Sequence, residues 1–383
     1  MINLRALVRG WELSRDNRLM FLSLLLWGSG EGLWFYIQPL YIQSLGADAV
    51  QIGLVLSLGA AAFTLTLLPG GWISDRYSRR KTMLGGYLLG IVGAMLLASA
   101  EDWRQLIPGF VLFYASGYCV PAIDSYIAHA AGGRDLSRVF STTFAAYNIG
   151  LTFSPVLGGW LGEVFGLRTV FWISALLFAA STVAVWLVSE QPVTPHHQRP
   201  SHRTVLGHRP FWRLTLFFSL LFFALALGQP FAPNYLTDVY QLDLSSIGLL
   251  GTLNSLGGAL LGLVLGRWWP GRQGLLIGQA LVLVSLALFL NSAALSVLAL
   301  AFLLKGASRA CHALASAHLG LTLDPRLLGL GFGVYQTGTN AALVIVPYLA
   351  GWLYALRPEY PFWISALGIP LTIVLTAFLI KGR

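Results

Sequence analysis

The sequence predicts an all-α membrane protein with twelve transmembrane helices in two pseudo-symmetric six-helix bundles. Three observations lead to this fold class. The 383 residues are 56% hydrophobic and 10% charged, with a mean hydropathy of +0.71. Apolar runs long enough to cross a bilayer recur along the chain, and its two halves share short motifs. Because soluble domains carry about 25% charged residues, the composition excludes a soluble globule and a disordered chain.

Twelve apolar runs stand between polar breaks, and a membrane-spanning helix needs about 20 such residues. Each run is longer than the ten or so residues of a membrane β-strand. The first run is too long for a cleaved signal. The predicted spans are 19–42, 50–73, 83–100, 105–131, 139–162, 168–188, 211–237, 246–268, 273–291, 295–320, 328–354 and 361–380.

The positions of Lys and Arg predict the orientation, because cytoplasmic loops are enriched in both. Of the 24 basic residues, the loops on one side hold only Arg104, Arg168 and Arg357, and two more fall inside spans. All others lie on the opposite side, with both termini and the central loop. We therefore expect a multi-pass protein of the cell (inner) membrane with cytoplasmic termini. The formal charge of +9 is explained by the basic residues of these cytoplasmic loops. We therefore expect no nucleic-acid partner.

An internal repeat predicts the two bundles. The hexamer Phe171–Leu176 recurs letter for letter at Phe362–Leu367. A shared hexamer containing Trp, in register with further matches, argues against chance. Those matches pair Pro155, Gly159 and Trp160 with Pro347, Gly351 and Trp352, and Ile52-Gly53 with Ile247-Gly248. Two parallel six-helix halves that handle substrate between them near the midplane form a transporter architecture.

The predicted domains are an N-terminal bundle at 1–188, a cytoplasmic linker at 189–210 and a C-terminal bundle at 211–383. The linker is rich in proline and has no apolar period. It carries His196, His197, His202 and His208, and imidazoles can bind transition metals. A solvated basic linker explains these residues better because no scaffold holds them together. We expect no metal and no cofactor.

The loop after the second span carries a specific motif. Its residues Gly71, Asp75, Arg76, Arg79 and Arg80 match the pattern Gly-x-x-x-Asp-Arg-x-Gly-Arg-Arg, with a serine in place of the second glycine. The loop therefore resembles the signature loop of the major facilitator superfamily. The resemblance implies the major facilitator fold and a cytoplasmic gate latch. In this latch the Asp75 carboxylate lies at a helix N-terminus of the other half, where the dipole favours an anion, and the arginines support it.

A second motif lies in the fifth span, at Gly150, Pro155, Gly158 and Gly159. It is similar to the Gly-x-x-x-Gly-Pro-x-x-Gly-Gly stretch that is typical of the family's proton-coupled exporters. Small residues also allow close helix packing, and proline bends a span. The motif therefore has an exporter interpretation and a packing interpretation.

Four charged residues fall well inside predicted spans: Glu31, Asp124, Lys305 and Arg309. A charge at mid-bilayer costs about 2.5–3.5 kcal/mol, so such residues usually face a cavity and have a function. We expect Glu31 and Asp124 to couple protons by pairing with the two cations across the bundles. Fixed structural pairs are the alternative. His312 lies at a similar depth and could relay protons or donate a hydrogen bond.

Helical spacing extends this candidate site. Trp27, Trp34 and Gln38 share a predicted face with Glu31, and Lys305, Arg309 and His312 share another. The family resemblance implies that spans one, four, seven and ten line the central path. The candidate substrate-binding residues are Trp27, Trp34, Gln38, Gln229, Asn234, Lys305, Arg309, Tyr335, Gln336 and Asn340.

Together these features predict a secondary active transporter that works by alternating access. The leading hypothesis is proton-coupled export of amphipathic or drug-like small molecules by antiport. The alternatives are proton-coupled import of a sugar or organic anion, and lipid translocation. No zinc-protease, nucleophile-elbow or phosphate-loop motif is present, so an enzyme is not expected. The expected partners are a small-molecule substrate, protons and the lipid bilayer, and we expect a monomer.

Overall fold

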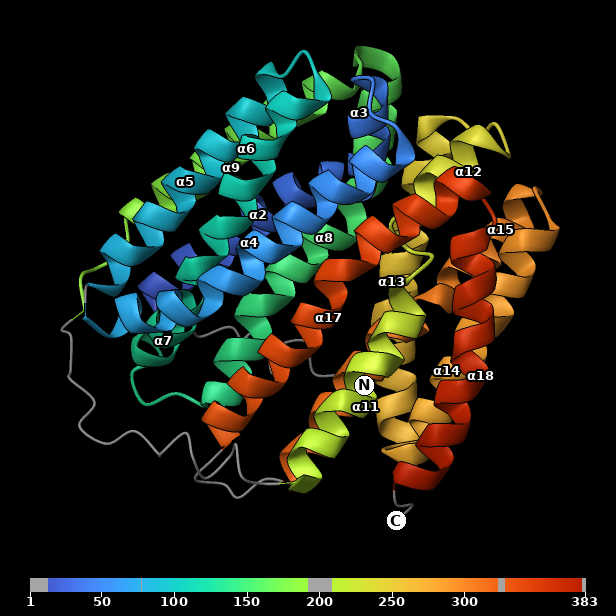
Figure 1. The fold of residues 1–383 in the computed structure, drawn as a ribbon. Helices are drawn as coiled ribbons and strands as arrows, with labels where there is room; N and C mark the ends of the chain where they lie inside the picture. The colour runs from blue at the N-terminus through green and yellow to red at the C-terminus, as the bar shows by residue number, and fades with distance from the viewer. Residues whose placement is uncertain (1–12, 77, 192–208, 323–327, 381–383) are drawn as a thin grey trace, which may run out of the picture.

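The computed structural model describes residues 13–76, 78–191, 209–322 and 328–380. Every regular element in these residues is helical, as Figure 1 shows. The side chains of Gly71, Asp75 and Arg76 and the four linker histidines lie outside the described part. The helices of the first half are α2 (Arg15–Phe35), α3 (Gln38–Ser44), α4 (Ala49–Arg76), α5 (Arg79–Ser99), α6 (Trp103–Ala115), η1 (Ser116–Cys119), α7 (Val120–Ala130), α8 (Leu136–Phe165) and α9 (Leu167–Trp186). Those of the second half are α11 (Arg209–Ala226), α12 (Ala232–Asp238), α13 (Leu244–Trp268), α14 (Arg272–Asn291), α15 (Leu295–Lys305), α16 (Ala307–Thr322), α17 (Leu328–Leu356) and α18 (Tyr360–Leu379).

The predicted spans coincide with single helices or with consecutive helices. Among the described residues, nine helices are long and apolar enough to cross a membrane, or ten if the bent pair α2 and α3 is one span. That count leaves out two predicted spans, 139–162 and 211–237. They correspond to α8, which has 30 residues, and to α11 followed by α12. The all-helical membrane fold is confirmed.

Four spans expected to be continuous are interrupted. The α2–α3 pair bends by 49°, and further breaks separate α6 from α7, α11 from α12, and α15 from α16. Pro39, Pro121 and Pro233 stand in the first turns of the restarting helices, where a missing backbone N–H costs nothing. At the last break, a Cβ on Gly306 would lie 2.2 Å from the Gly258 nitrogen, so only glycine fits.

Helices pack mostly within their own half. In the first half α2 packs on α8 and α9, and in the second half α14 packs on α15, α16 and α18. Packing between the halves is concentrated at α4–α17, α8–α13 and α3–α12. In Figure 1, α8 (green) and α17 (orange) accordingly lie in the middle of the molecule, where the first half meets the second half. The domain boundaries at 188 and 210 stay a prediction.

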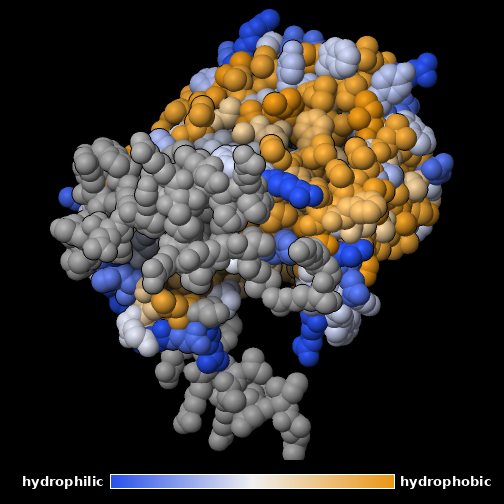
Figure 2. All heavy atoms as spheres, turned by 60° about the horizontal axis from the view of Figure 1, so that its bottom comes forward, coloured by the Kyte–Doolittle hydropathy of each residue, from blue (hydrophilic) through white to orange (hydrophobic). Residues whose placement is uncertain are grey.

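The lateral surface is apolar. On the face that Figure 2 shows, hydrophobic residues cover much of the described surface, and most hydrophilic ones lie toward its edges. Large apolar side chains such as Leu65, Leu263 and Phe378 are 73%, 73% and 82% exposed. Contiguous apolar surface of this extent is unfavourable in water and is expected against lipid tails.

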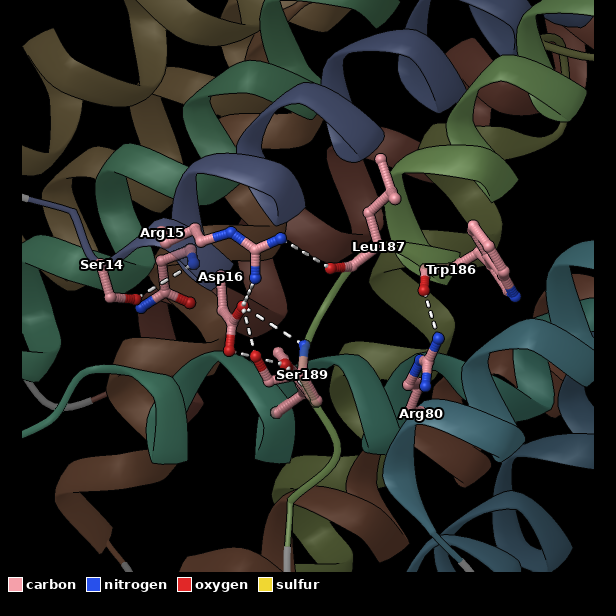
Figure 3. Close-up of polar contacts among 9 residues, drawn as sticks. Ser14, Arg15, Asp16, Arg80, Trp186, Leu187 and Ser189 are labelled. Carbon is pink, nitrogen blue, oxygen red and sulfur yellow. Dashed lines mark hydrogen bonds and ion pairs between the residues drawn. The ribbon is translucent and has the colours of Figure 1, made fainter.

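A polar cluster ties the segment after α9 to the start of α2 (Figure 3). The Asp16 carboxylate accepts hydrogen bonds from the Tyr126 hydroxyl at 3.1 Å, the Ser189 hydroxyl at 3.2 Å and the Ser189 amide at 3.3 Å. Asp16 also lies in the first turn of α2, where the helix dipole favours an anion. One carboxylate thus joins three segments of the first half.

We expect Asp16→Ala to lower the free energy of unfolding by about 1–3 kcal/mol, because it removes an acceptor from several polar groups at once. Thermal unfolding in detergent measures this change. Arg15→Ala is the matched control, since the Arg15 side chain is 67% exposed and lies 3.7 Å from Asp16, and exposed pairs contribute little. Equal effects of the two variants would contradict the assignment.

Candidate functional site

A cavity of about 790 Å³ is lined by residues of both halves. Residues of every helix from α2 to α8, the short helix η1 included, line it from the first half, and residues of α11, α12, α13, α15, α16 and α17 from the second. The interrupted helices all contribute, so the breaks lie beside this space. A cavity of this size is in the range of small-molecule sites.

The two walls of the cavity differ in chemistry. The first half supplies an aromatic wall, and the second half supplies a wall of amides and cations. The aromatic wall consists of Trp27, Phe35, Tyr36, Phe63, Tyr87, Phe113, Tyr114, Phe144 and Tyr147. The polar wall consists of Gln229, Asn254, Ser255, Lys305, Arg309 and Asn340.

Glu31 lies in the aromatic wall and accepts a hydrogen bond from the Tyr147 hydroxyl at 2.9 Å. Close contact between α2 and α8 allows this bond. A Cβ on Gly28 would lie 2.3 Å from the Tyr147 carbonyl oxygen, and one on Gly150 would lie 2.5 Å from the Ser29 nitrogen. Glycine at these positions therefore brings the two backbones together and fixes the carboxylate at the cavity.

Lys305 and Arg309 lie on either side of the break at Gly306. Lys305 is 9% exposed, and its Nζ lies 4.9 Å from the centre of the Phe302 ring. The Arg309 side chain passes Gly258, where a Cβ would lie 2.9 Å from Cδ. In the described part of the chain, the ion pairs within 4 Å are Arg15–Asp16, Arg80–Glu190 and Arg104–Asp102. Glu31 and the two cations thus line one cavity without direct pairing in this conformation.

Asp124 and His312 do not line the cavity. Asp124 is half-buried on α7, next to the cavity-lining Ile123. The His312 ring stacks on Phe222, with ring centres 3.5 Å apart. No ion pair within 4 Å joins Asp124 to a described cation. The proposed roles of Asp124 and His312 stay predictions.

The predicted substrate-binding residues separate into two groups. Trp27, Gln38, Gln229, Lys305, Arg309 and Asn340 line the cavity, whereas Trp34, Asn234, Tyr335 and Gln336 do not. Trp34 is fully buried against Phe171 of α9 and Phe113 of α6, although it shares a face of α2 with the cavity-lining Trp27. Tyr335 is buried and Gln336 is exposed.

Asn234 lies instead in a hydrogen-bonded group between α3 and α12. Its amide donates to Gln43 Oε1 at 2.7 Å, and the Gln43 amide donates to Asp238 at 3.1 Å. The Tyr354 hydroxyl donates to the same carboxylate at 2.9 Å. Three helices from two halves are therefore held together at the end where α4 begins.

Two glycine contacts close the cavity at that end. A Cβ on Gly53 of α4 would lie 2.4 Å from the Pro347 carbonyl oxygen, and one on Gly248 of α13 would lie 2.4 Å from that of Pro155. The residue after each proline donates its amide to a hydroxyl of the facing helix. Tyr348 N donates to Ser57 Oγ at 3.0 Å, and Val156 N donates to Thr252 Oγ1 at 3.1 Å. We call these contacts the α4–α17 seam and the α8–α13 seam.

The motif of the fifth span lies along these contacts. A Cβ on Gly159 would lie 2.2 Å from the Leu244 carbonyl oxygen, and one on its repeat partner Gly351 would lie 2.3 Å from that of Ala49. Gly158 and Gly150 face α2 instead. The cavity-lining residues of α4, such as Phe63, follow the seam in the chain. The cavity thus extends from the seams toward the side where α2 begins.

The described arginines of the loop motif contact the end of α9 and the segment after it, and Figure 3 shows the contact of Arg80 with Trp186. Arg79 donates to Gln191 Oε1 at 3.0 Å, and Arg80 donates to the Trp186 carbonyl oxygen. Arg80 also lies 3.9 Å from Glu190. These contacts join α5 to the end of α9 and to the first residues of the predicted linker, and none of them reaches the second half. The latch predicted for Asp75 lies outside the described side chains.

Sequence reasoning missed the partner of Glu31. Tyr147 is not among the predicted site residues, because a contact between α2 and α8 has no spacing signal in the chain. The seams had a signal, since the repeat already paired Gly53 with Gly248 and Pro155 with Pro347. Among the described residues, no group of three or more His, Cys, Asp or Glu is placed to hold a metal ion.

Comparison with known proteins agrees with this architecture. A family model described as Major Facilitator Superfamily matches residues 19–231 and 214–383. The chain is 27% identical over 343 residues to the multi-drug resistance efflux pump PmrA of Streptococcus pneumoniae serotype 4, covering 86% of this chain and 81% of that protein. It is 26% identical over 270 residues to the enterobactin exporter EntS of Shigella flexneri, covering 68% and 65%.

Solved structures share the fold at low identity. A variant of the nucleoside transporter NupG superposes with a TM-score of 0.81 at 15% identity, covering 96% of this chain and 100% of that one. The POT family transporter PepTSo gives 0.76 at 13% identity, covering 96% and 98%. With its helical membrane fold and a family model that matches nearly its whole length, the chain belongs to the Major Facilitator Superfamily and is a multi-pass membrane transporter, not an enzyme.

Proposed function

We propose that the protein exports amphipathic small molecules by proton-coupled antiport. The observation that carries this proposal is the cavity between the halves, with an aromatic wall on one side and a polar wall on the other. An amphipathic molecule can place its apolar body on the first wall and its polar group on the second. The similarity to the efflux pump PmrA supports the direction.

The proposed mechanism is alternating access of two bundles, 1–188 and 211–383, joined by the linker 189–210. The seams close one end of the cavity, and the cavity extends toward the side that the basic residues predict to be cytoplasmic. In this conformation a cytoplasmic molecule would enter, and opening of the seams would release it on the other side. Such rocking of two halves around a midplane site is general for this architecture.

Glu31 is the residue we propose for proton coupling. Among the described residues it is the acid that lines the cavity, and it accepts a hydrogen bond from Tyr147 on the wall that faces the two cations. Protonation would cancel its charge and change its attraction to the facing wall. A ligand or proton shifts a conformational equilibrium only when it binds the two states differently, and a carboxylate on the moving interface meets that condition.

A second candidate function is uptake of an organic anion, which Lys305 and Arg309 favour because both face the cavity without an acidic partner within 4 Å. Direction separates the two functions. The protein would be reconstituted in vesicles and transport of amphipathic dyes followed under an imposed pH gradient of either sign. Export requires that the dye moves in the direction opposite to the protons, and that this movement stops when an uncoupler removes the pH gradient. Movement of dye only with the protons would contradict export and support uptake.

A further inference from the structure

The charges that line the cavity are unevenly divided between the halves. Glu31 is the one cavity-lining acid among the described residues, and Lys305 and Arg309 are the bases. The acid already accepts a hydrogen bond from Tyr147. The described residues give neither base a carboxylate within 4 Å. The cavity therefore offers positive charge, without a matching anion, on its second-half wall.

The position of Arg309 is unfavourable for the fold alone. Arg309 lies in the first turn of α16, which begins at Ala307. The C-terminal end of α15 abuts this turn, because only Gly306 separates the two helices of one span. Burial of a cation at membrane depth is costly. A guanidinium kept at such a position, beside a second cation four residues earlier, is explained by an anion that both of them contact.

The aromatic wall indicates the chemical nature of the part of that anion that carries no charge. Trp27, Phe35 and Tyr114 line the cavity from the first half and offer apolar ring surface. Phe35 is 39% exposed, and Phe113 supports the Trp27 ring from behind, at 6.1 Å between ring centres. Such surface binds aromatic or aliphatic groups and leaves a small hydrophilic anion without partners. The recognised molecule thus needs an apolar body as well as a charge.

We propose that the transported substrate is an amphipathic organic anion. Its apolar body lies on the aromatic wall, and its carboxylate, sulfonate or phosphate group lies between Lys305 and Arg309. This inference rests on the proposed function and specifies its substrate class. Because one molecule contacts both halves, its binding depends on how the halves are placed, as alternating access requires.

The test uses three ligands with one pyrene body and different head groups: a butyrate, a butanol and a butyl-trimethylammonium. Binding to the purified full-length protein is measured by thermal stabilisation, and transport is measured in vesicles. We expect the anion to bind about tenfold or more tightly than the alcohol, and the cation to bind most weakly. A lysophosphatidate included beside them distinguishes a lipid substrate from a soluble amphipath.

The variants Lys305→Gln and Arg309→Gln should each weaken binding of the anion about tenfold and leave binding of the alcohol unchanged. Arg104→Gln, at an exposed arginine outside the cavity, is the control. If either variant fails to fold, the comparison of head groups in the unmodified protein still decides. Transport of the cation but not the anion would overturn this inference and leave export standing. Transport of none of the ligands would overturn both proposals.

Discussion

Gly248→Ala and Gly53→Ala are expected to hold the seam end of the cavity open and to stop transport. Each adds a Cβ that would lie 2.4 Å from the carbonyl oxygen of the proline in the facing helix. Because this distance is too short for a contact, the two backbones must separate. Overpacking of this kind costs about 1–3 kcal/mol, which changes the ratio of closed to open protein about 5- to 150-fold. The double variant should combine both effects, because the seams are separate sites.

Gly262→Ala is a matched control in the same helix as Gly248. A Cβ on Gly262 meets no atom within 4 Å, so we expect normal transport. Spin labels at Glu101→Cys and Arg357→Cys, on opposite halves near the seam end, measure the opening. The seam variants should lengthen this distance and Gly262→Ala should not. Transport at the normal rate in Gly248→Ala would contradict the assigned role of the seam.

The second large effect is expected for Glu31→Gln, which keeps the shape of the side chain and removes its charge. Transport driven by a pH gradient should fall to background, and the remaining substrate binding should lose its dependence on pH. Tyr147→Phe removes only the hydrogen bond to Glu31, so an intermediate loss is expected. Vesicle transport with and without a pH gradient measures both.

Asp135→Asn provides the control for a carboxylate outside the cavity, because Asp135 caps α8 at an exposed position. Asp124→Asn tests the second membrane carboxylate, which the structure places outside the cavity lining. If Glu31→Gln kept the transport rate and pH profile of the unmodified protein, Glu31 would have no part in coupling.

The spans and the family could be predicted because they depend on local sequence. Hydropathy over 20 residues is a property of the chain itself, and the repeat at Phe171–Leu176 and Phe362–Leu367 is exact. The breaks could not be read in the same way. Gly306 resembles many other glycines of apolar runs, and its close contact with Gly258 exists only in the folded protein.

The sequence predicted the cavity lining best where the depth of a residue in the membrane decides its place. It predicted the lining less well where the place depends on the direction in which a side chain leaves its helix. Glu31, Lys305 and Arg309 line the cavity, as expected for charges within spans, whereas Asp124 does not. Trp34 lies in the core because Phe171 of α9 and Phe113 of α6 cover its ring, and helical spacing does not predict contacts with other helices. Tyr147 contacts Glu31 across two helices, and helical spacing carries no information on such a pair.

The central claim is that the transported molecule occupies the cavity between the aromatic and polar walls. Alkylation of Asn340→Cys, on the polar wall, tests it in a protein whose two native cysteines are replaced. Ala293→Cys, in an exposed loop, is the control. A transported compound should slow alkylation at Asn340→Cys and leave Ala293→Cys unchanged. Equal alkylation rates at Asn340→Cys with and without a compound that the protein demonstrably transports would contradict the account.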